Sequence, residues 1–166
     1  MFKLFSKPAS GKEKFDFSML KVDMHSHLLP GIDDGAKDLE NSLELIRGLK
    51  ALGYKKLITT PHILWDMYRN TPAIIAEKLE LVKEAVKNEG IDIEIEAAAE
   101  YFLDEHMQEL LHKKEPLLTL SGKLVLTEFS MAYASMNVKD ILFDMQMQGY
   151  QPVIAHPERY AYLQRN

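Results

Sequence analysis

Short apolar runs alternate with helical patterns along this chain of 166 residues, and this alternation restricts the fold more than any other feature. The apolar runs cover residues 20–24, 56–60, 91–99, 124–127 and 152–155, and the helical patterns cover 38–52, 71–90, 104–112 and 137–149. One strand and one helix in roughly every 30 residues is the spacing of βαβ units. We therefore predict an α/β fold in which parallel strands form a sheet or a barrel.

Each predicted strand ends in a side chain that can bind a divalent metal ion. In chain order these residues are His25 and His27, His62, Glu100, Glu128 and His156. The carboxyl ends of parallel barrel strands converge on one face, so these side chains are expected to share one small volume. A single His at a strand end is more often an ordinary hydrogen-bonded turn residue, but a coincidence at all five ends is hard to attribute to chance.

The loop after the first strand adds two carboxylates, Asp33 and Asp34, between Gly31 and Gly35. The glycines would let this loop bend back over the site, with Asp34 as a ligand and Asp33 orienting a neighbour. Imidazole and carboxylate ligands without thiolate suit manganese, iron or zinc in a catalytic site with open positions. Arg159 could hold the remaining charge of a bound phosphate.

Composition excludes several other classes of protein. The chain has no cysteine, which rules out disulfides, thiolate zinc sites and a cysteine-dependent phosphatase. Residues 1–18 carry four Lys against one Glu and one Asp, so the body from residue 19 onward is near -7 and is a poor match for nucleic acid. The chain has neither an apolar run of membrane-spanning length nor a recognisable signal peptide. We expect residues 1–18 to be a flexible lead-in, the protein to be cytoplasmic and no part of it to insert into a membrane.

The sequence gives less specific predictions for three other groups of residues. His106 and His112 lie in a predicted helix and are expected on its surface. The loop residues Trp65, Met67 and Tyr68 either line a substrate cleft or pack under their loop. Residues 92, 94 and 96 are expected to form a solvated strand face.

The ordered motifs resemble a known group of enzymes. They are Asp23-Met24-His25-Ser26-His27, Asp33-Asp34-Gly35, Thr60-Pro61-His62, Ala99-Glu100, Thr127-Glu128 and His156-Pro157-Glu158-Arg159. In this order they resemble the polymerase-and-histidinol-phosphatase (PHP) superfamily. Within it they are similar to the bacterial manganese-dependent protein-tyrosine phosphatases of capsule and exopolysaccharide operons, the CpsB/CapC family.

This resemblance implies a distorted, TIM-like (β/α)7 barrel and a centre of two to three divalent ions. The ions would be Mn2+, with Fe, Mg or Zn as alternatives. The implied ligands are His25, His27, Asp34, His62, Glu100, Glu128 and His156. Glu100 would bridge two ions, and Arg159 and His156 would be the catalytic residues, with Arg159 on the phosphate. The implied substrate is phosphotyrosine on the tail of a cognate tyrosine kinase that controls polysaccharide export.

The sequence departs from the family pattern after residue 160. Family members continue beyond this point and contribute an Asp-x-His pair and a second arginine, which this sequence does not contain. We therefore expect residues 19–166 to be the N-terminal part of a PHP domain, with a barrel that is incomplete on its C-terminal side. Two alternatives stay open: a PHP phosphatase of a small ester such as histidinol phosphate, and a non-catalytic metal-binding remnant. The sequence also leaves a homo-oligomer open.

Overall fold

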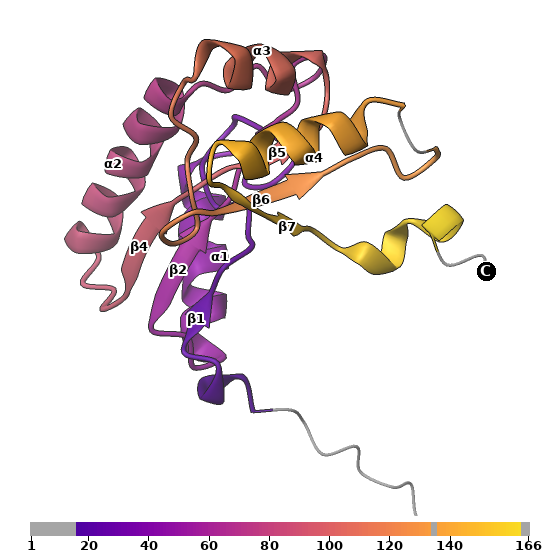
Figure 1. The fold of residues 1–166 in the computed structure, drawn as a ribbon. Helices are drawn as coiled ribbons and strands as arrows, with labels where there is room; N and C mark the ends of the chain where they lie inside the picture. The colour runs from indigo at the N-terminus through magenta and orange to yellow at the C-terminus, as the bar shows by residue number, and fades with distance from the viewer. Residues whose placement is uncertain (1–15, 134–135, 164–166) are drawn as a thin grey trace, which may run out of the picture.

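Parallel strands and flanking helices make up the computed structural model, which describes residues 16–133 and 136–163 (Figure 1). One sheet contains β1 (Val22–Asp23), β2 (Lys56–Thr59) and β4 (Glu94–Ala97). The other contains β3 (His62–Ile63), β5 (Glu100–Phe102), β6 (Leu124–Glu128) and β7 (Gln151–Ile154). Each neighbouring pair of these strands is parallel, which confirms the predicted α/β fold with parallel strands.

Two segments of the chain each contribute a strand to both sheets. β2 leads into β3 through Thr60 and Pro61, and β4 leads into β5 through Ala98 and Ala99. β2 pairs with β4, and β3 then pairs with β5, so the same two segments run side by side before and after the break. Neighbouring strand positions therefore follow the order of the chain: β1, β2 with β3, β4 with β5, β6 and β7.

The prediction of one strand across residues 91–99 was wrong in its extent. The regular strand begins only at Glu94 and ends at Ala97, and Glu100 opens a strand of the other sheet. The second run breaks in the same way beside Pro61, which has no N–H to donate to a ladder.

Four α-helices flank the strands in the described part of the chain. They are α1 (Leu39–Ala51), α2 (Pro72–Asn88), α3 (Glu105–Lys113) and α4 (Val138–Met147), close to the predicted ranges. The side chains of Asp38, Thr71 and Asp104 accept backbone N–H bonds at the first turns of α1, α2 and α3. Asn137 precedes α4 but its side chain does not cap the helix, because it donates to Gln108 instead.

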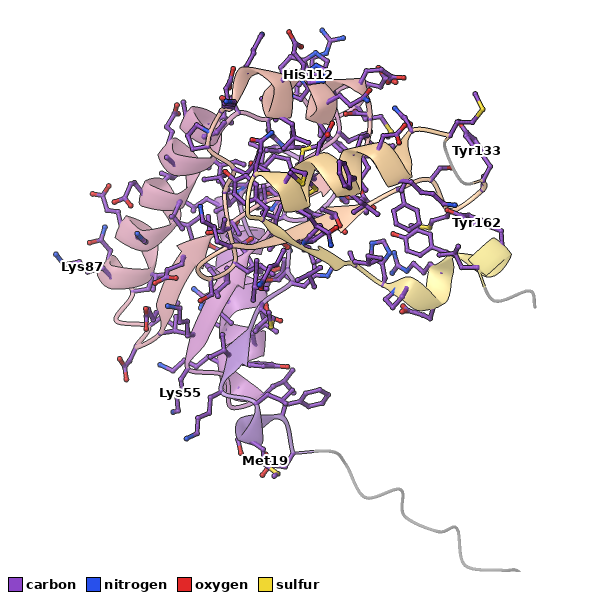
Figure 2. The ribbon with its side chains drawn as sticks, in the orientation of Figure 1. Met19, Lys55, Lys87, His112, Tyr133 and Tyr162 are labelled. Atoms are coloured by element: carbon purple, nitrogen blue, oxygen red, sulfur yellow. The ribbon has the colours of Figure 1, made fainter. Side chains whose placement is uncertain are left out.

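The core lies between the strands and these helices. Leu57 of β2 and Val125 of β6 are completely buried, as are Ile46 of α1 and Val82 of α2. Helix α1 packs against α2, α2 against β4, α3 against α4, and α4 against β7. Lys87, in the last turn of α2, points away from this core (Figure 2). Among the residues described, no helix combines the length and the apolar character that a membrane crossing requires.

Most of the expected lead-in, residues 1–15, lies outside the described residues. The structure describes its last three residues, 16–18, and Phe17–Met19 form a 3-10 helix. This turn lies against the loop after α1, where a Cβ on Gly53 would come within 2.5 Å of the Ser18 Cβ.

Candidate metal centre

The predicted strand-end residues gather in one cluster. His25 and His27 follow β1, His62 opens β3, Glu100 opens β5, Glu128 closes β6, and His156 follows β7. His62 and Glu100 also lie three residues beyond the ends of β2 and β4, so all six side chains lie near the carboxyl ends of strands, where a parallel arrangement brings side chains together. Sequence positions 25 and 156 become neighbours in this way, with ring centroids 5.8 Å apart.

Glu100 is the centre of the cluster and is 1% exposed. Its Oε2 lies 3.0 Å from Nε2 of His25 and 3.3 Å from Nε2 of His27. Its Oε1 lies 3.0 Å from Nε2 of His156, and His62 Nδ1 is 3.5 Å from Oε2. One buried carboxylate thus contacts imidazoles from three different strand positions.

Two further carboxylates extend the cluster around His62. Glu128 Oε1 lies 2.9 Å from His62 Nδ1, and Glu128 Oε2 lies 3.5 Å from Nε2 of His156. On the other side, Asp34 Oδ1 lies 3.5 Å from His62 Nε2, and the Asp34 side chain is largely exposed. Buried carboxylates therefore form the floor of the cluster, and Asp34 lies at its solvent edge.

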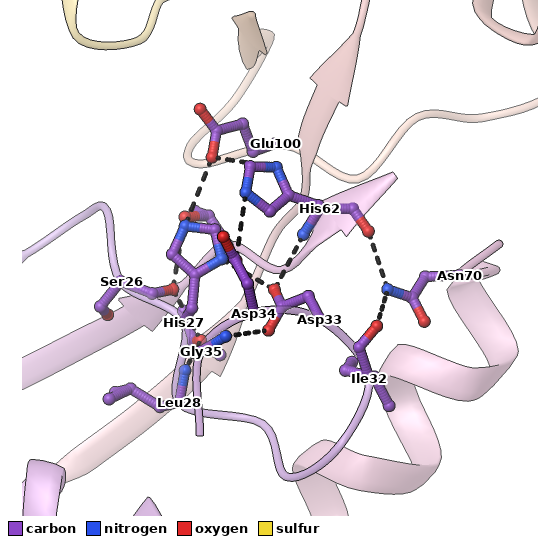
Figure 3. Close-up of polar contacts among 12 residues, drawn as sticks. Ser26, His27, Leu28, Ile32, Asp33, Asp34, Gly35, His62, Asn70 and Glu100 are labelled. Atoms are coloured by element: carbon purple, nitrogen blue, oxygen red, sulfur yellow. Dashed lines mark hydrogen bonds and ion pairs between the residues drawn. The ribbon is translucent and has the colours of Figure 1, made fainter. Parts of the chain in front are cut away.

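Asp33 holds the first loop in place and orients His27 (Figure 3). Its Oδ2 accepts from His27 Nδ1 at 2.7 Å and from the backbone N–H of His62 at 3.1 Å. Its Oδ1 accepts from the backbone N–H of Gly35 at 3.0 Å. A partner of this kind fixes the tautomer and the direction of a ligating imidazole, which is the orienting role expected of Asp33.

Gly35 allows the loop to approach His27 closely. A Cβ at this position would meet the His27 Cβ at 2.3 Å and the His27 carbonyl oxygen at 2.4 Å. The chain also turns back at Gly31, which has a φ of +71° and donates to the carbonyl of Ala36 at 2.8 Å. The loop thus bends over the site as the two glycines predicted.

Two buried polar residues that support the site were not predicted. Asn70 donates from Nδ2 to the carbonyls of Ile32 (2.9 Å) and His62 (2.8 Å), which ties the first loop to β3 (Figure 3). Thr59, at the end of β2, donates to the carbonyl of Ser26 at 2.9 Å. Neither residue has a metal-binding side chain or a motif spacing, so sequence patterns offered no signal for them.

The cluster shifts the proton affinities of its members. Burial lowers the pKa of His27, but its hydrogen bonds to Asp33 and Glu100 outweigh burial and raise the pKa to about 10. Burial also disfavours the charged form of Glu100, yet the hydrogen bonds from His25 and His27 hold its pKa well below the ordinary value. For His62, the nearby carboxylate of Glu128 outweighs burial and raises the pKa. The carboxylates thus favour positive charge at this place.

The donor atoms form three overlapping groups that could each hold a metal ion. The groups are His25, His27 and Glu100; His27, Asp34 and His62; and His62, Glu100 and Glu128. Within each group the ligand atoms lie within 4.8 Å of one another. His156 belongs to none of these three groups but contacts both Glu100 and Glu128.

The chemistry of this donor set fits divalent metal ions. Every donor is an imidazole nitrogen or a carboxylate oxygen, a mixture that suits first-row divalent ions. Nδ1 of His62 is buried without a hydrogen-bond partner of good geometry, although it lies close to two carboxylates. A nitrogen left in this way among acidic oxygens is available to a cation.

An open cleft of about 990 Å³ lies over the cluster. Arg159, in the 3-10 helix Pro157–Arg159 that follows His156, lines this cleft. Met67 and Tyr68 line it too. Of the two predictions made for these residues, the cleft wall is therefore confirmed and packing under the loop is not.

Trp65 lies outside the cleft, where its ring stacks on His106 of α3 with centroids 3.8 Å apart. His112 is exposed on α3, as expected (Figure 2).

Fold and site together define an α/β protein whose parallel strand ends carry a cluster able to hold several metal ions. Residues 21–166 match the family described as "Capsular polysaccharide synthesis, CpsB/CapC". The chain belongs to this CpsB/CapC family.

Relatives and a solved structure agree with this assignment. The chain is 32% identical over 145 residues to the tyrosine-protein phosphatase YwqE of Bacillus subtilis and 33% identical over 145 residues to the tyrosine-protein phosphatase CpsB of Streptococcus pneumoniae. These matches cover 87% of this chain but 57% and 60% of the two relatives, so the chain spans less than two thirds of their length.

A solved structure from work on YwqE and CpsB, described as unique metal-dependent tyrosine phosphatases, superposes with a TM-score of 0.78. The sequence identity to it is 32%, and the match covers 87% of this chain and 59% of that one.

Proposed function

We propose that this chain carries the metal-binding residues of a protein-tyrosine phosphatase active site. Its substrate would be phosphotyrosine on the tail of a cognate bacterial tyrosine kinase, in the synthesis of capsule or exopolysaccharide. The observation that carries this proposal is the set of three overlapping donor groups beneath a cleft lined by Arg159. The names of the relatives support the reaction, and the name of the family supports the pathway.

The proposed metal ligands are the residues that were predicted from the sequence. They are His25, His27, Asp34, His62, Glu100, Glu128 and His156. Glu100 belongs to two of the three donor groups and would bridge two ions. The ions would be two to three Mn2+, with Fe, Mg or Zn as alternatives. Divalent ions in such a site supply a hydroxide at neutral pH and neutralise charge on a phosphate ester.

The chain's own residues would bind and orient the ester. We assign the phosphate to the guanidinium of Arg159, because this side chain lines the cleft and presents a fork of N–H donors to phosphate oxygens. His156 precedes Arg159 by three residues and contacts Glu100 and Glu128, so one short segment would join the metal cluster to the phosphate. We further propose that the strand order β1 to β7 is part of the wall of a distorted PHP barrel.

The test is hydrolysis of a phosphotyrosine peptide by the purified protein. We expect Mn2+-stimulated release of phosphate that His25→Ala reduces on the order of a hundredfold or more, because the change removes a ligand next to the buried Glu100. His112→Ala is the matched control, since His112 is exposed on α3 and lies outside the cleft. This variant should keep full activity.

Other outcomes would decide between the alternatives. A preference for histidinol phosphate over the phosphotyrosine peptide would favour a small-ester phosphatase. Binding of Mn2+ without hydrolysis of any phosphomonoester would contradict the proposed function and favour a non-catalytic metal-binding protein.

A further inference from the structure

Aromatic side chains line the cleft next to the donor cluster. Tyr68 lies on one side, with its ring parallel to that of His62 within 16° and the centroids 5.6 Å apart. Phe102 lies at the end of β5 and also lines the cleft. Both rings are only partly buried, so each keeps an apolar surface that the fold itself does not cover.

Strand geometry gives Phe102 its direction. Successive side chains of a strand point to opposite faces, so Phe102 points to the same face as Glu100, two residues earlier. Tyr101, between them, is 1% exposed and belongs to the core. Phe102 is also the partner of Glu128 in the pairing of β5 with β6. The Phe102 ring therefore lies next to Glu100 along β5 and next to Glu128 on the neighbouring strand β6.

A short hairpin holds Tyr68 in position. The backbone N–H of Tyr68 donates to the carbonyl of Leu64 at 2.7 Å, and that of Leu64 donates to the carbonyl of Tyr68 at 3.3 Å. On the outer side of the hairpin, Trp65 stacks on His106 of α3, and Arg69 donates to the Trp65 carbonyl at 2.9 Å. The ring of Tyr68 is therefore presented on a supported loop, which reduces the entropy that a ligand must overcome on binding.

We propose that Tyr68 and Phe102 determine specificity by contacting the aryl group of the substrate, so that the site selects aryl over alkyl phosphate esters. The proposal rests on the proposed function, because the phosphate must be held by the donor cluster and Arg159. If the donor cluster and Arg159 hold the phosphate, the aryl ring attached to it by one ester bond would lie beside the rings of Tyr68 and Phe102. An alkyl phosphate would leave both rings uncovered and would gain little from them.

The first test measures binding, independently of turnover. Phenylphosphonate and methylphosphonate carry the same charged group and differ in the ring, and neither has an ester bond to hydrolyse. With Mn2+ present, we expect the protein to bind phenylphosphonate roughly tenfold more tightly than methylphosphonate by calorimetry. Tyr68→Leu and Phe102→Leu should each reduce this ratio severalfold and leave the affinity for methylphosphonate within about twofold.

Three controls separate the ring contact from other effects. Tyr68→Phe should keep the ratio, because it removes only the hydroxyl. Phe143→Leu should keep it too, since Phe143 is exposed on α4 and does not line the cleft. A thermal melt of each variant checks that Phe102→Leu still folds, and Tyr68→Leu tests the proposal on a loop residue if it does not.

The outcomes for this inference and for the proposed function differ. A wild-type ratio near one, or a ratio that both Leu variants leave unchanged, would overturn the inference. If the ratio behaves as expected but no ester is hydrolysed, the inference stands as a binding preference and the proposed phosphatase activity fails. If esters are hydrolysed, the Leu variants should raise KM for an aryl phosphate and leave kcat/KM for an alkyl phosphate nearly unchanged.

Discussion

Glu100 shows how single side chains set the charge of the cluster. Four imidazoles lie within 3.5 Å of its carboxylate, from His25, His27, His62 and His156. A buried carboxylate needs compensating positive charge, and in the metal-free protein the proton on His27, whose pKa is raised, contributes it. A proton on His27 and a metal ion therefore compete for the same place, because an imidazole nitrogen must lose its proton before it can ligate.

This competition predicts how metal affinity depends on pH. The pKa of His27 is raised to about 10 in the metal-free protein, so its second nitrogen stays protonated at neutral pH. At lower pH a proton competes more effectively for the His27 nitrogen, and at higher pH the metal ion does. We expect Mn2+ affinity to increase from about pH 6 to about pH 9, with up to about tenfold per pH unit for each proton displaced.

The measurement is calorimetry in buffers of different ionisation heats, which counts the protons released on binding. Asp33→Asn weakens a hydrogen bond that raises the pKa of His27, so fewer protons should be released by this variant near neutral pH. Metal binding without any proton release would contradict this account of His27.

At the scale of elements, the loop between β1 and α1 depends on a contact that only glycine permits. Gly35→Ala would put a Cβ 2.3 Å from the Cβ of His27, so the loop or the imidazole must move. We expect a loss of about 1–3 kcal/mol in the free energy of unfolding, together with weaker Mn2+ binding. Chemical denaturation and calorimetry measure the two effects.

Gly48→Ala is the matched control for this change. Gly48 lies within α1, is exposed, and a Cβ there would meet nothing within 4 Å. Alanine should stabilise the helix by about 0.5–1 kcal/mol and leave metal binding unchanged. Equal effects of the two substitutions would contradict the steric argument for Gly35.

The helices and the strand-end donors could be predicted because local signals determine them. Thr71 and Asp104 cap their helices as their side chains suggest, and the donor residues follow directly from where the apolar runs end. The breaks after β2 and β4 could not be read from these runs, since the apolar pattern continues through Ala98 and Ala99. Pairing between distant strands decides where each sheet ends, and a single sequence does not contain that information.

Some residues of the site were missed for the same reason, and one could have been found. Asn70 and Thr59 act through buried backbone carbonyls whose positions depend on tertiary structure. Phe102 stands two residues after Glu100, so strand alternation alone would have placed it beside the donors.

For the whole molecule, metal ions at the strand ends should link elements that otherwise meet only through the core. The donors come from five successive strand positions, so ions bound among them stabilise the folded chain over the unfolded one. At a free ion concentration 100 times Kd, one site adds about 2.7 kcal/mol. For a chain of this length, the midpoint of thermal unfolding should rise by roughly 5–10 °C.

The stabilisation should depend on Glu100 specifically. Glu100→Gln removes the central charge at nearly constant shape, so Mn2+ should no longer raise the unfolding midpoint. Glu96→Gln is the matched control, because Glu96 is exposed in β4 and pairs with Lys56 outside the cluster. An equal Mn2+-induced shift in both variants would show that the ions bind elsewhere.

The paired strand breaks also restrict how the chain can vary in length. His62 and Glu100 are directly opposite each other in the register of β3 with β5, three residues beyond the last pair of β2 with β4 on each segment. Inserting or deleting one residue in either break would turn the following strand by half a pleat and direct its donor into the core. These short connectors would therefore tolerate substitution far better than any change in the number of their residues.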